Sequence, residues 1–301
     1  MPYLVLSIAA MTCLALVLRI AMARGTDALG VNVVFRAAAA TSTVASVVLL
    51  LDGADVVGLW PQVSWRVAWA SVFFFLSGLA SIKSLQHGHL GLSWGVLRCS
   101  MLLPVVASIT IWREIPVWPV SALLLVRVAG MISACLAIAL VTGGQARRAS
   151  VRVSSRQADR QTWLLWLGLA FLSQGMWEVV LRSTRDLPDD RARTLFVAGT
   201  FLGAALLSAG SVCVLDVRIR RRELGFGLAA GVLGALASGS RVWALRDLDG
   251  LVVFPVTTVT VMIAVHLLGG VIWREKTGLL STLGFVLAVL SVLLMSLRFP
   301  F

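Results

Sequence analysis

The chain has 301 residues, of which 59% are apolar and only 13% are charged, whereas soluble domains are about half apolar and about a quarter charged. This composition excludes a soluble globular protein and predicts an all-α integral membrane protein, because lipid tolerates only backbone whose polar groups are bonded internally. The net charge of +12 comes almost wholly from arginine in short connections between apolar segments. Such a pattern indicates contact with the lipid bilayer, so we expect no nucleic-acid partner.

Ten apolar segments follow one another, each about as long as a membrane-spanning helix requires. They predict helices at residues 3–22, 31–51, 67–87, 91–111, 117–141, 163–183, 194–215, 224–245, 251–271 and 278–298. The first lacks a basic start and is expected to be a span and not a cleavable signal. A basic linker at 143–161 separates a five-helix repeat at 1–142 from a second at 162–301.

The two halves match at a constant offset of 161 residues. Ile111-Trp112-Arg113-Glu114 recurs as Ile272-Trp273-Arg274-Glu275, and Ser77-Gly78 recurs as Ser238-Gly239. We interpret this as an internal duplication. Because each copy has an odd number of predicted spans, the second must be inverted in the membrane, an architecture of secondary transporters. Within the tetrapeptide, tryptophan and arginine suit the headgroup layer, and glutamate suits the N-terminus of the helix that follows.

Small residues recur every four positions in the predicted helix 224–245. They are Gly227, Gly231, Ala235 and Gly239. This spacing permits close approach of another helix, and it leaves open whether the helix only packs tightly or also moves as a gate.

Ionisable residues inside predicted spans are costly, and each is a candidate for function. Arg36 and Arg127 lie near helix ends, and we expect them to reach the membrane surface. Arg98 lies deeper and shares a helix face with Trp94. The repeat-related face of the helix 251–271 carries His266. A cationic wall of this kind suits a substrate with a carboxylate or phosphate group.

Glu178 is the only acid inside a predicted span, one turn before Arg182 and at a similar depth to Arg241. It forms either a structural ion pair with one of these arginines or a proton-coupling site. Trp94 and Trp243 either stack on a substrate or pack in the core. Thr257 and Thr258 follow Pro255 and either bond to the carbonyl that this proline frees or contact a ligand. The candidate substrate-binding residues are Trp94, Arg98, Glu178, Arg241, Trp243, Thr257, Thr258 and His266.

Patterns for an enzyme are missing from the sequence. We find no phosphate-binding glycine loop, no Ser/His/Asp set and no paired carboxylates. Two histidines, His87 and His89, are too few ligands for a metal site, and the four cysteines lack metal or redox spacing. We therefore expect no catalytic residue, metal or cofactor.

The orientation follows from basic residues in the connections. Thirteen lie in loops after odd-numbered helices and eight lie in the other loops and termini. The positive-inside rule then predicts a cytoplasmic linker, with both termini on the other side.

A family resemblance rests on two sets of residues. The second half contributes Phe254-Pro255-Val256, the run from Gly269 to Lys276, and Gly284, and the first half contributes Pro104, Trp112-Arg113-Glu114 and Gly130. In these residues the sequence resembles the EamA type of the drug/metabolite transporter superfamily. The resemblance implies a ten-helix carrier of the bacterial inner membrane that works by alternating access, usually with cytoplasmic termini. In the small multidrug members a glutamate of the first helix binds protons and drugs. Glu178 lies in the first helix of the second repeat, whereas the matching position of the first repeat is Val17.

We therefore expect a secondary transporter of a small polar metabolite, and the sequence leaves open whether that cargo is anionic, such as an amino acid or a phosphorylated compound. The alternatives are a flippase or scramblase for lipid-linked headgroups, a proton-coupled drug exporter and a membrane scaffold. The coupling ion, the direction of transport and the oligomeric state stay open.

Overall fold

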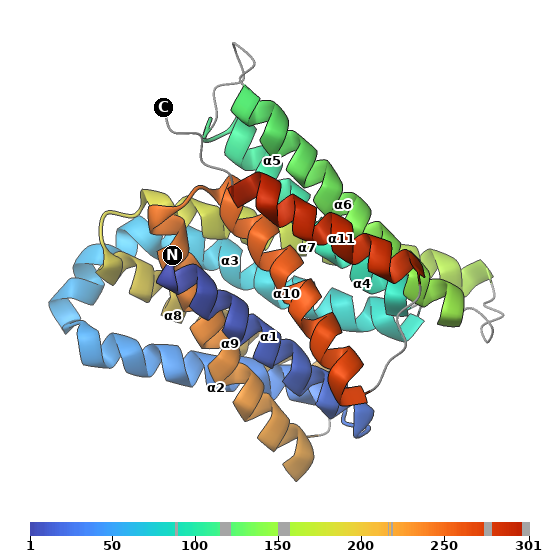
Figure 1. Ribbon diagram of the computed structural model, residues 1–301. Coiled ribbons are helices and arrows are strands. Elements are labelled where there is room, and N and C mark those ends of the chain that lie inside the picture. The colour runs from blue at the N-terminus through green and yellow to red at the C-terminus, as the bar shows by residue number, and fades with distance from the viewer. Residues whose placement is uncertain are drawn as a thin grey trace. The chain divides into compact units, whose positions relative to one another are not determined.

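The fold is seen in a computed structural model that describes residues 1–87, 90–114, 122–149, 157–215, 217, 219–273 and 279–296. Helices account for nearly all of these residues, and no strand occurs among them (Figure 1). Seven helices are long and apolar enough to cross a membrane. Both observations confirm that the chain is an all-α membrane protein.

The helices follow the ten predicted segments with two differences. Their bounds are α1 (Pro2–Ala23), α2 (Ala28–Leu50), α3 (Gly53–His87), α4 (Leu90–Cys99), α5 (Leu102–Thr110), α6 (Ala122–Ala149), α7 (Gln157–Arg182), α8 (Asp190–Leu215), α9 (Arg221–Asp247), α10 (Gly250–Trp273) and α11 (Leu279–Ser296), with a short 3-10 turn, η1, at Ser183–Asp186.

The first difference is the start of α3, which the sequence placed at residue 67. The helix begins at Gly53 because the Asp52 carboxylate accepts a hydrogen bond from the Asp55 N–H at 2.8 Å and so satisfies a free donor of the first turn. Pro61 lies within this helix. The second difference is that the predicted helix 91–111 is two helices, α4 and α5.

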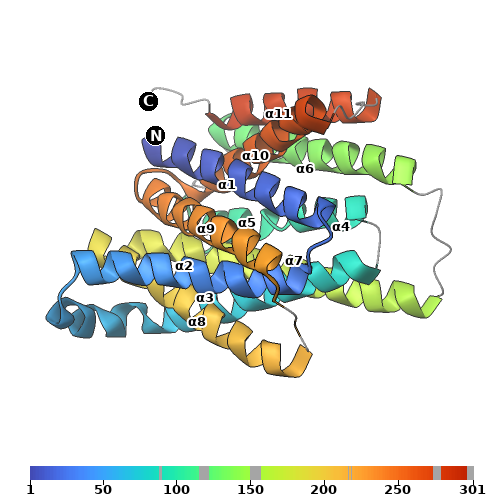
Figure 2. The same cartoon turned by 90° about the horizontal axis from the view of Figure 1, so that it is seen from below.

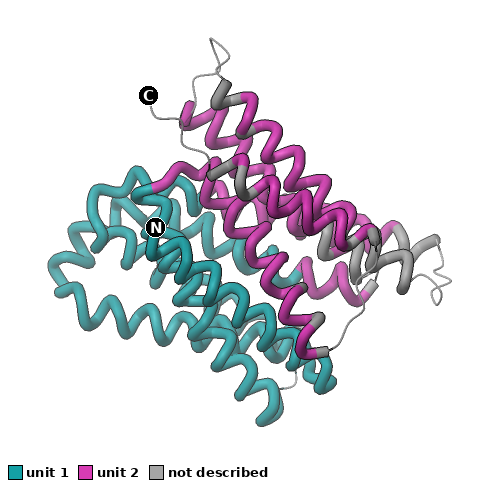
Figure 3. The backbone as a smooth tube through the Cα atoms, viewed as in Figure 1, with its two compact units in different colours: residues 1–79, 180–247 teal, residues 80–179, 248–301 magenta. Residues whose placement is uncertain are grey.

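Two compact units make up the chain (Figure 3). Unit 1 consists of residues 1–79 and 180–247, and unit 2 consists of residues 80–179 and 248–301. Each unit therefore contains a segment from both halves of the sequence. The predicted division at the linker 143–161 concerns the repeat inferred from the sequence, and its halves do not coincide with these units.

In unit 1, α9 packs against α1 and α2, and α2 also packs against α8. A methyl group added at Gly231 would lie 2.6 Å from the Phe35 carbonyl oxygen and 2.5 Å from the Ala38 Cβ. A methyl group added at Gly227 would be similarly close to α2, at 2.4 Å from the Val34 Cβ. The four-residue pattern thus allows close packing of α9 on α2, as the packing alternative predicted. It stops before Gly239, where such a methyl group would meet nothing within 4 Å.

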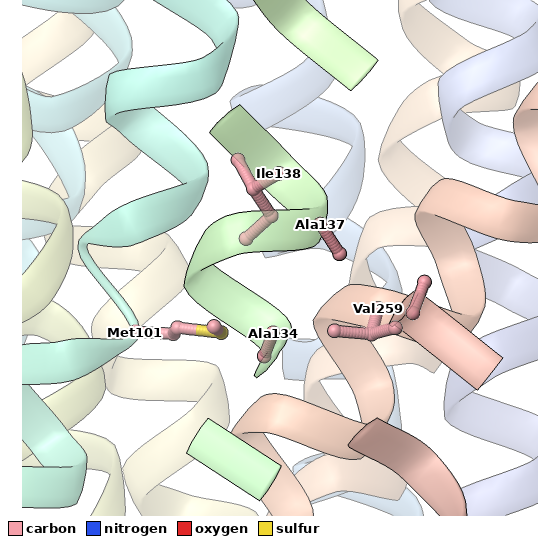
Figure 4. Packing of buried hydrophobic residues seen from close by; sticks show 6 residues of the cluster. Met101, Ala134, Ala137, Ile138 and Val259 are labelled. Atoms are coloured by element: carbon pink, nitrogen blue, oxygen red, sulfur yellow. The ribbon is translucent and has the colours of Figure 1, made fainter. Parts of the chain in front are cut away.

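In unit 2, α6 and α11 lie side by side in two perpendicular views (Figure 1, Figure 2). The Ser291 hydroxyl of α11 donates to the Gly130 carbonyl of α6 at 2.8 Å. Next to this contact, Met101 and Val259 point toward Ala134 from either side (Figure 4). The core of unit 2 therefore joins α5, α6, α10 and α11.

The tetrapeptide at residues 111–114 closes α5. Arg113 adopts a left-handed backbone conformation with φ of 48°. The Glu114 carboxylate accepts hydrogen bonds from the N–H groups of Gly250 and Leu251, at 3.2 and 3.1 Å. Glu114 thus caps α10, a helix of the second half. The start of the helix that follows Glu114 lies outside the described residues, so capping of that helix stays a prediction. Arg274 and Glu275 of the second copy lie outside the described residues.

Candidate functional site

The candidate residues fall in both compact units. Trp94, Arg98, Glu178, Thr257, Thr258 and His266 belong to unit 2, and Arg241 and Trp243 belong to unit 1. Trp94 lies in α4 and His266 in α10, but their side chains lie outside the described part of the structure.

In the described part of unit 2, the backbone is interrupted between α4 and α5. The Ser100 N–H and hydroxyl both donate to the Leu97 carbonyl, at 3.2 and 2.7 Å, and the Leu103 N–H donates to the Ser100 carbonyl at 3.0 Å. These bonds span three residues instead of four, so the chain tightens here. Pro104 explains the change, because it has no N–H for the Ser100 carbonyl and its ring would clash with that carbonyl.

The break lies deep in the protein. α4 has ten residues, or about 15 Å of helix, which is about half of a hydrocarbon core of roughly 30 Å. Ser100 is 2% exposed and Met101 is 1% exposed. Non-helical backbone at such depth is tolerated when it is enclosed by protein or lines a polar cavity.

Arg98 lies in the last turn of α4, immediately before this break. Its side chain is half-buried. A cation is favoured at a helix C-terminus, where carbonyl groups carry partial negative charge. The structure therefore places one of the predicted site residues beside the interrupted backbone.

The repeat-related helix α10 is continuous and apolar at the same position. The counterpart of Arg98 is Val259, which is fully buried in the core of unit 2. Arg98 and the break are thus features of the first half alone.

Thr257 and Thr258 are both buried in α10. The Thr257 hydroxyl donates to the Val253 carbonyl at 2.6 Å. The carbonyl that Pro255 deprives of its helical donor is that of Leu251, so this hydroxyl does not bond to the freed group. One expectation for Thr257 was therefore wrong. Contact with a ligand stays a prediction for both threonines.

Glu178 is 5% exposed in α7. Its carboxylate accepts a hydrogen bond from the Gln174 amide at 3.3 Å, one turn earlier. The predicted partners Arg182 and Arg241 are counted with unit 1, so pairing with either stays a prediction. Within unit 1, Arg182 lies 3.8 Å from the Asp186 carboxylate.

Arg241 and Trp243 both lie in α9. Arg241 is 6% exposed. The Trp243 ring packs against Tyr3 of α1, with ring centroids 5.4 Å apart and planes tilted by 51°. This contact gives Trp243 a packing role at the start of α1.

Arg36 of α2 is the residue that sequence reasoning misjudged. It was expected to reach the membrane surface, but it is 3% exposed inside unit 1. Its Nη1 donates to the Ser208 hydroxyl at 2.7 Å, and its Nη2 donates to the carbonyls of Phe74 and Phe75 at 3.2 and 3.0 Å. The guanidinium carbon also lies 5.6 and 5.1 Å from the centroids of these two rings. One cation thus joins α2, α3 and α8.

The close approach of Arg36 to α3 depends on Gly78. A methyl group at this position would lie 2.2 Å from Arg36 Nη2 and 3.0 Å from the Asn32 amide nitrogen. The repeated Ser-Gly pair at residues 77–78 was the one sequence signal that a side chain, here that of Arg36, packs against this part of α3. Ser208, which accepts the hydrogen bond from Arg36 Nη1, lies 172 residues away in sequence, and no sequence pattern pointed to it.

Comparison with known proteins identifies the fold alone. Neither the protein-family models nor the curated proteins contain a match to this chain. Among solved structures, 26 chains match. One of them, a crystal structure, superposes with a TM-score of 0.75 and 14% identity over 98% of this chain and 95% of its own. The chain therefore shares an architecture that is already known from solved structures.

Proposed function

We propose that the chain is a secondary transporter that moves a small polar metabolite, with an anionic compound favoured, across a bacterial inner membrane by alternating access. The observation that carries the proposal is the buried break beside Arg98. In secondary transporters, interrupted helices near the bilayer midplane form substrate sites. The ten residues of α4 would place the interruption at about that depth in a spanning α4–α5 pair. It adjoins a cationic side chain, which suits a carboxylate or phosphate group.

The inverted five-helix repeat, in the manner of EamA-type drug/metabolite transporters, is part of this proposal. The offset of 161 residues relates α1 to α7, α2 to α8, α3 to α9, the α4–α5 pair to α10, and α6 to α11. Ser291 and Gly130, which are hydrogen-bonded, are separated by the same 161 residues. A direct contact between repeat-related positions is expected near a twofold axis, and this supports the duplicated architecture.

Transport by the purified protein in proteoliposomes tests the proposal. Candidate cargoes are first screened by thermal shift with amino acids and sugar phosphates, because a bound ligand raises apparent stability with the logarithm of its concentration relative to its dissociation constant. Uptake of a radiolabelled hit is then compared in Arg98→Gln, in Arg98→Lys and in the control Arg191→Gln, which removes an exposed arginine paired with Asp55.

We expect Arg98→Gln to reduce uptake at least tenfold, Arg98→Lys to retain part of it, and Arg191→Gln to behave as the unmodified protein. Uptake unaffected by Arg98→Gln would remove Arg98 from the path. A protein that transports no cargo and exchanges headgroup-labelled lipids between leaflets would instead favour the flippase alternative.

A second candidate function, proton-coupled export of drugs, is favoured by Glu178. This carboxylate is buried in a spanning helix and accepts a hydrogen bond from the Gln174 amide, and an ionisable group at such a position is a candidate for proton coupling. Export of a cationic dye driven by an imposed pH gradient tests it. Glu178→Gln should abolish the dependence on that gradient, and export that keeps its dependence in this variant would exclude the residue.

A further inference from the structure

The two ends of unit 1 differ in whether their arginines form ion pairs with carboxylates of the protein. One end, here the aspartate end, joins the starts of α3 and α8 to the end of α9 through Arg191–Asp55 at 2.8 Å and Arg246–Asp190 at 3.0 Å. The other, here the arginine end, joins the end of α1 to the starts of α2 and α9. There the Asp27 N–H donates to Glu223 at 3.1 Å.

At the aspartate end, arginines lie against carboxylates. Besides the two pairs above, Arg193 lies 2.9 Å from Asp190, Arg246 lies 2.8 Å from Asp247, and Arg182 lies 3.8 Å from Asp186. Arg193 Nη2 also donates to the Leu187 carbonyl at 2.8 Å. The positive charge at this end is therefore largely neutralised by the protein itself.

At the arginine end, the acids are bound to backbone instead. The Asp27 carboxylate accepts from the Leu29 N–H, and the Glu223 carboxylate accepts from the N–H groups of Asp27 and Arg220, each at 3.1 Å. Both carboxylates thus cap helices. Arg24, Arg221 and Arg222 are exposed, and within the described residues none of them forms an ion pair with a carboxylate.

We infer that the arginine end of unit 1 lies in the cytoplasmic leaflet and binds anionic phospholipid headgroups through Arg221, Arg222 and Arg24. Guanidinium groups without protein carboxylates are free to form bidentate bonds with phosphate. The cytoplasmic leaflet is the anionic one, and basic residues flanking spans are retained on that side. The Arg24 guanidinium carbon lies 5.6 Å from the ring centroid of Phe226, a residue of α9 one helical turn after Arg222.

This arrangement fixes the orientation of unit 1. Tyr3 packs against Trp243 close to the end of α9, so the start of α1 belongs to the aspartate end. The amino terminus then lies on the extracytoplasmic side. This orientation agrees with the basic-residue count of the sequence and is opposite to the one that the family resemblance implies. It holds whatever the chain transports.

Lipid binding is tested by titrating phosphatidylglycerol or phosphatidylcholine into the detergent-solubilised protein and following thermal unfolding. We expect phosphatidylglycerol to stabilise the protein more. The preference should fall about fivefold for each arginine lost, or roughly 25-fold in the Arg221→Gln/Arg222→Gln variant. The matched control Arg191→Gln/Arg246→Gln removes the same charge from the aspartate end and should keep the preference. Equal losses in both variants would overturn the proposal. So would an equal shift with inorganic phosphate, which would indicate a soluble-anion site.

Orientation is tested independently in intact cells with a membrane-impermeant maleimide. Pro188→Cys reports on the aspartate end and Ile219→Cys on the arginine end, each in a chain whose native cysteines are replaced by alanine. Both positions are exposed. We expect labelling of Pro188→Cys before lysis and of Ile219→Cys only after it. The reverse pattern would overturn the inference.

Discussion

Gly78→Ala should destabilise unit 1 strongly, whereas the same change at the repeat-related Gly239 should not. The new methyl group at residue 78 would lie 2.2 Å from Arg36 Nη2, so the guanidinium must leave the carbonyls of Phe74 and Phe75. Each hydrogen bond from a charged donor contributes about 1.5–3 kcal/mol to stability. The higher helix propensity of alanine offsets up to about 1 kcal/mol of the loss. The net expectation is a loss of about 2–5 kcal/mol in the free energy of unfolding.

At Gly239 the added methyl group meets nothing within 4 Å, so Gly239→Ala should leave stability unchanged or slightly higher. Equilibrium unfolding of the two purified variants in mild detergent gives the comparison. A third variant, Gly78→Ala with Arg36→Met, identifies the cause. Once the guanidinium is gone, the methyl group should cost little more than Arg36→Met alone, since the two positions are coupled. Equal effects of Gly78→Ala and Gly239→Ala, or additive effects in the double variant, would refute the reasoning.

Three further predictions concern contacts within one unit, each measured as a change in thermal unfolding of the purified protein. Glu114→Ala removes the cap of α10 and should lower stability by about 1–2 kcal/mol, and Glu114→Asp should lower it by less. Unchanged stability of Glu114→Ala would show that other groups accept the hydrogen bonds of the first N–H groups of α10. Ser291→Ala removes the bond to the Gly130 carbonyl and should cost about 1 kcal/mol, whereas Ser291→Cys, which keeps a weak donor, should cost less. Asp190→Asn weakens the ion pairs with Arg193 and Arg246, in which the Asp190 side chain is 53% exposed, so each should contribute below about 1 kcal/mol; a loss above about 3 kcal/mol would contradict this estimate.

Hydrophobic runs predicted most of the helices because a lipid-spanning segment leaves the backbone few alternatives. The start of α3 was missed for a different reason. Its first residues include Gly58 and Pro61, which resemble a loop by composition, whereas helix formation there begins from the Asp52 cap. A cap is a single local bond, and a hydropathy pattern does not register it.

The break between α4 and α5 shows a similar limit. Residues 90–110 are mostly apolar, with Arg98 as their one charged residue, so they were predicted as part of one helix. Pro104 was the only signal, and its effect depends on context, because Pro255 lies inside the continuous helix α10. Distinguishing the two prolines requires the surrounding packing, which the sequence does not state.

The candidate site was anticipated unevenly. Arg98 was selected for its depth, and its position beside the break adds a reason that depth alone did not provide. Arg36 was judged by its distance from a helix end, yet its environment is set by Ser208, Phe74 and Phe75 on two other helices. Contacts between segments so far apart in sequence decide whether a charge faces lipid, solvent or protein.

The interleaving of the two units has a consequence for how the chain is made. Residues 1–79 and 180–247 are complete when residue 247 leaves the ribosome, so unit 1 can close before α10 and α11 exist. α6 must also wait, because the Ser291 donor for Gly130 is synthesised 161 residues later. At about 5–20 residues per second, this delay is about 10–30 s. During that time the face of α6 that will later contact α11 is open to lipid or to the insertion machinery.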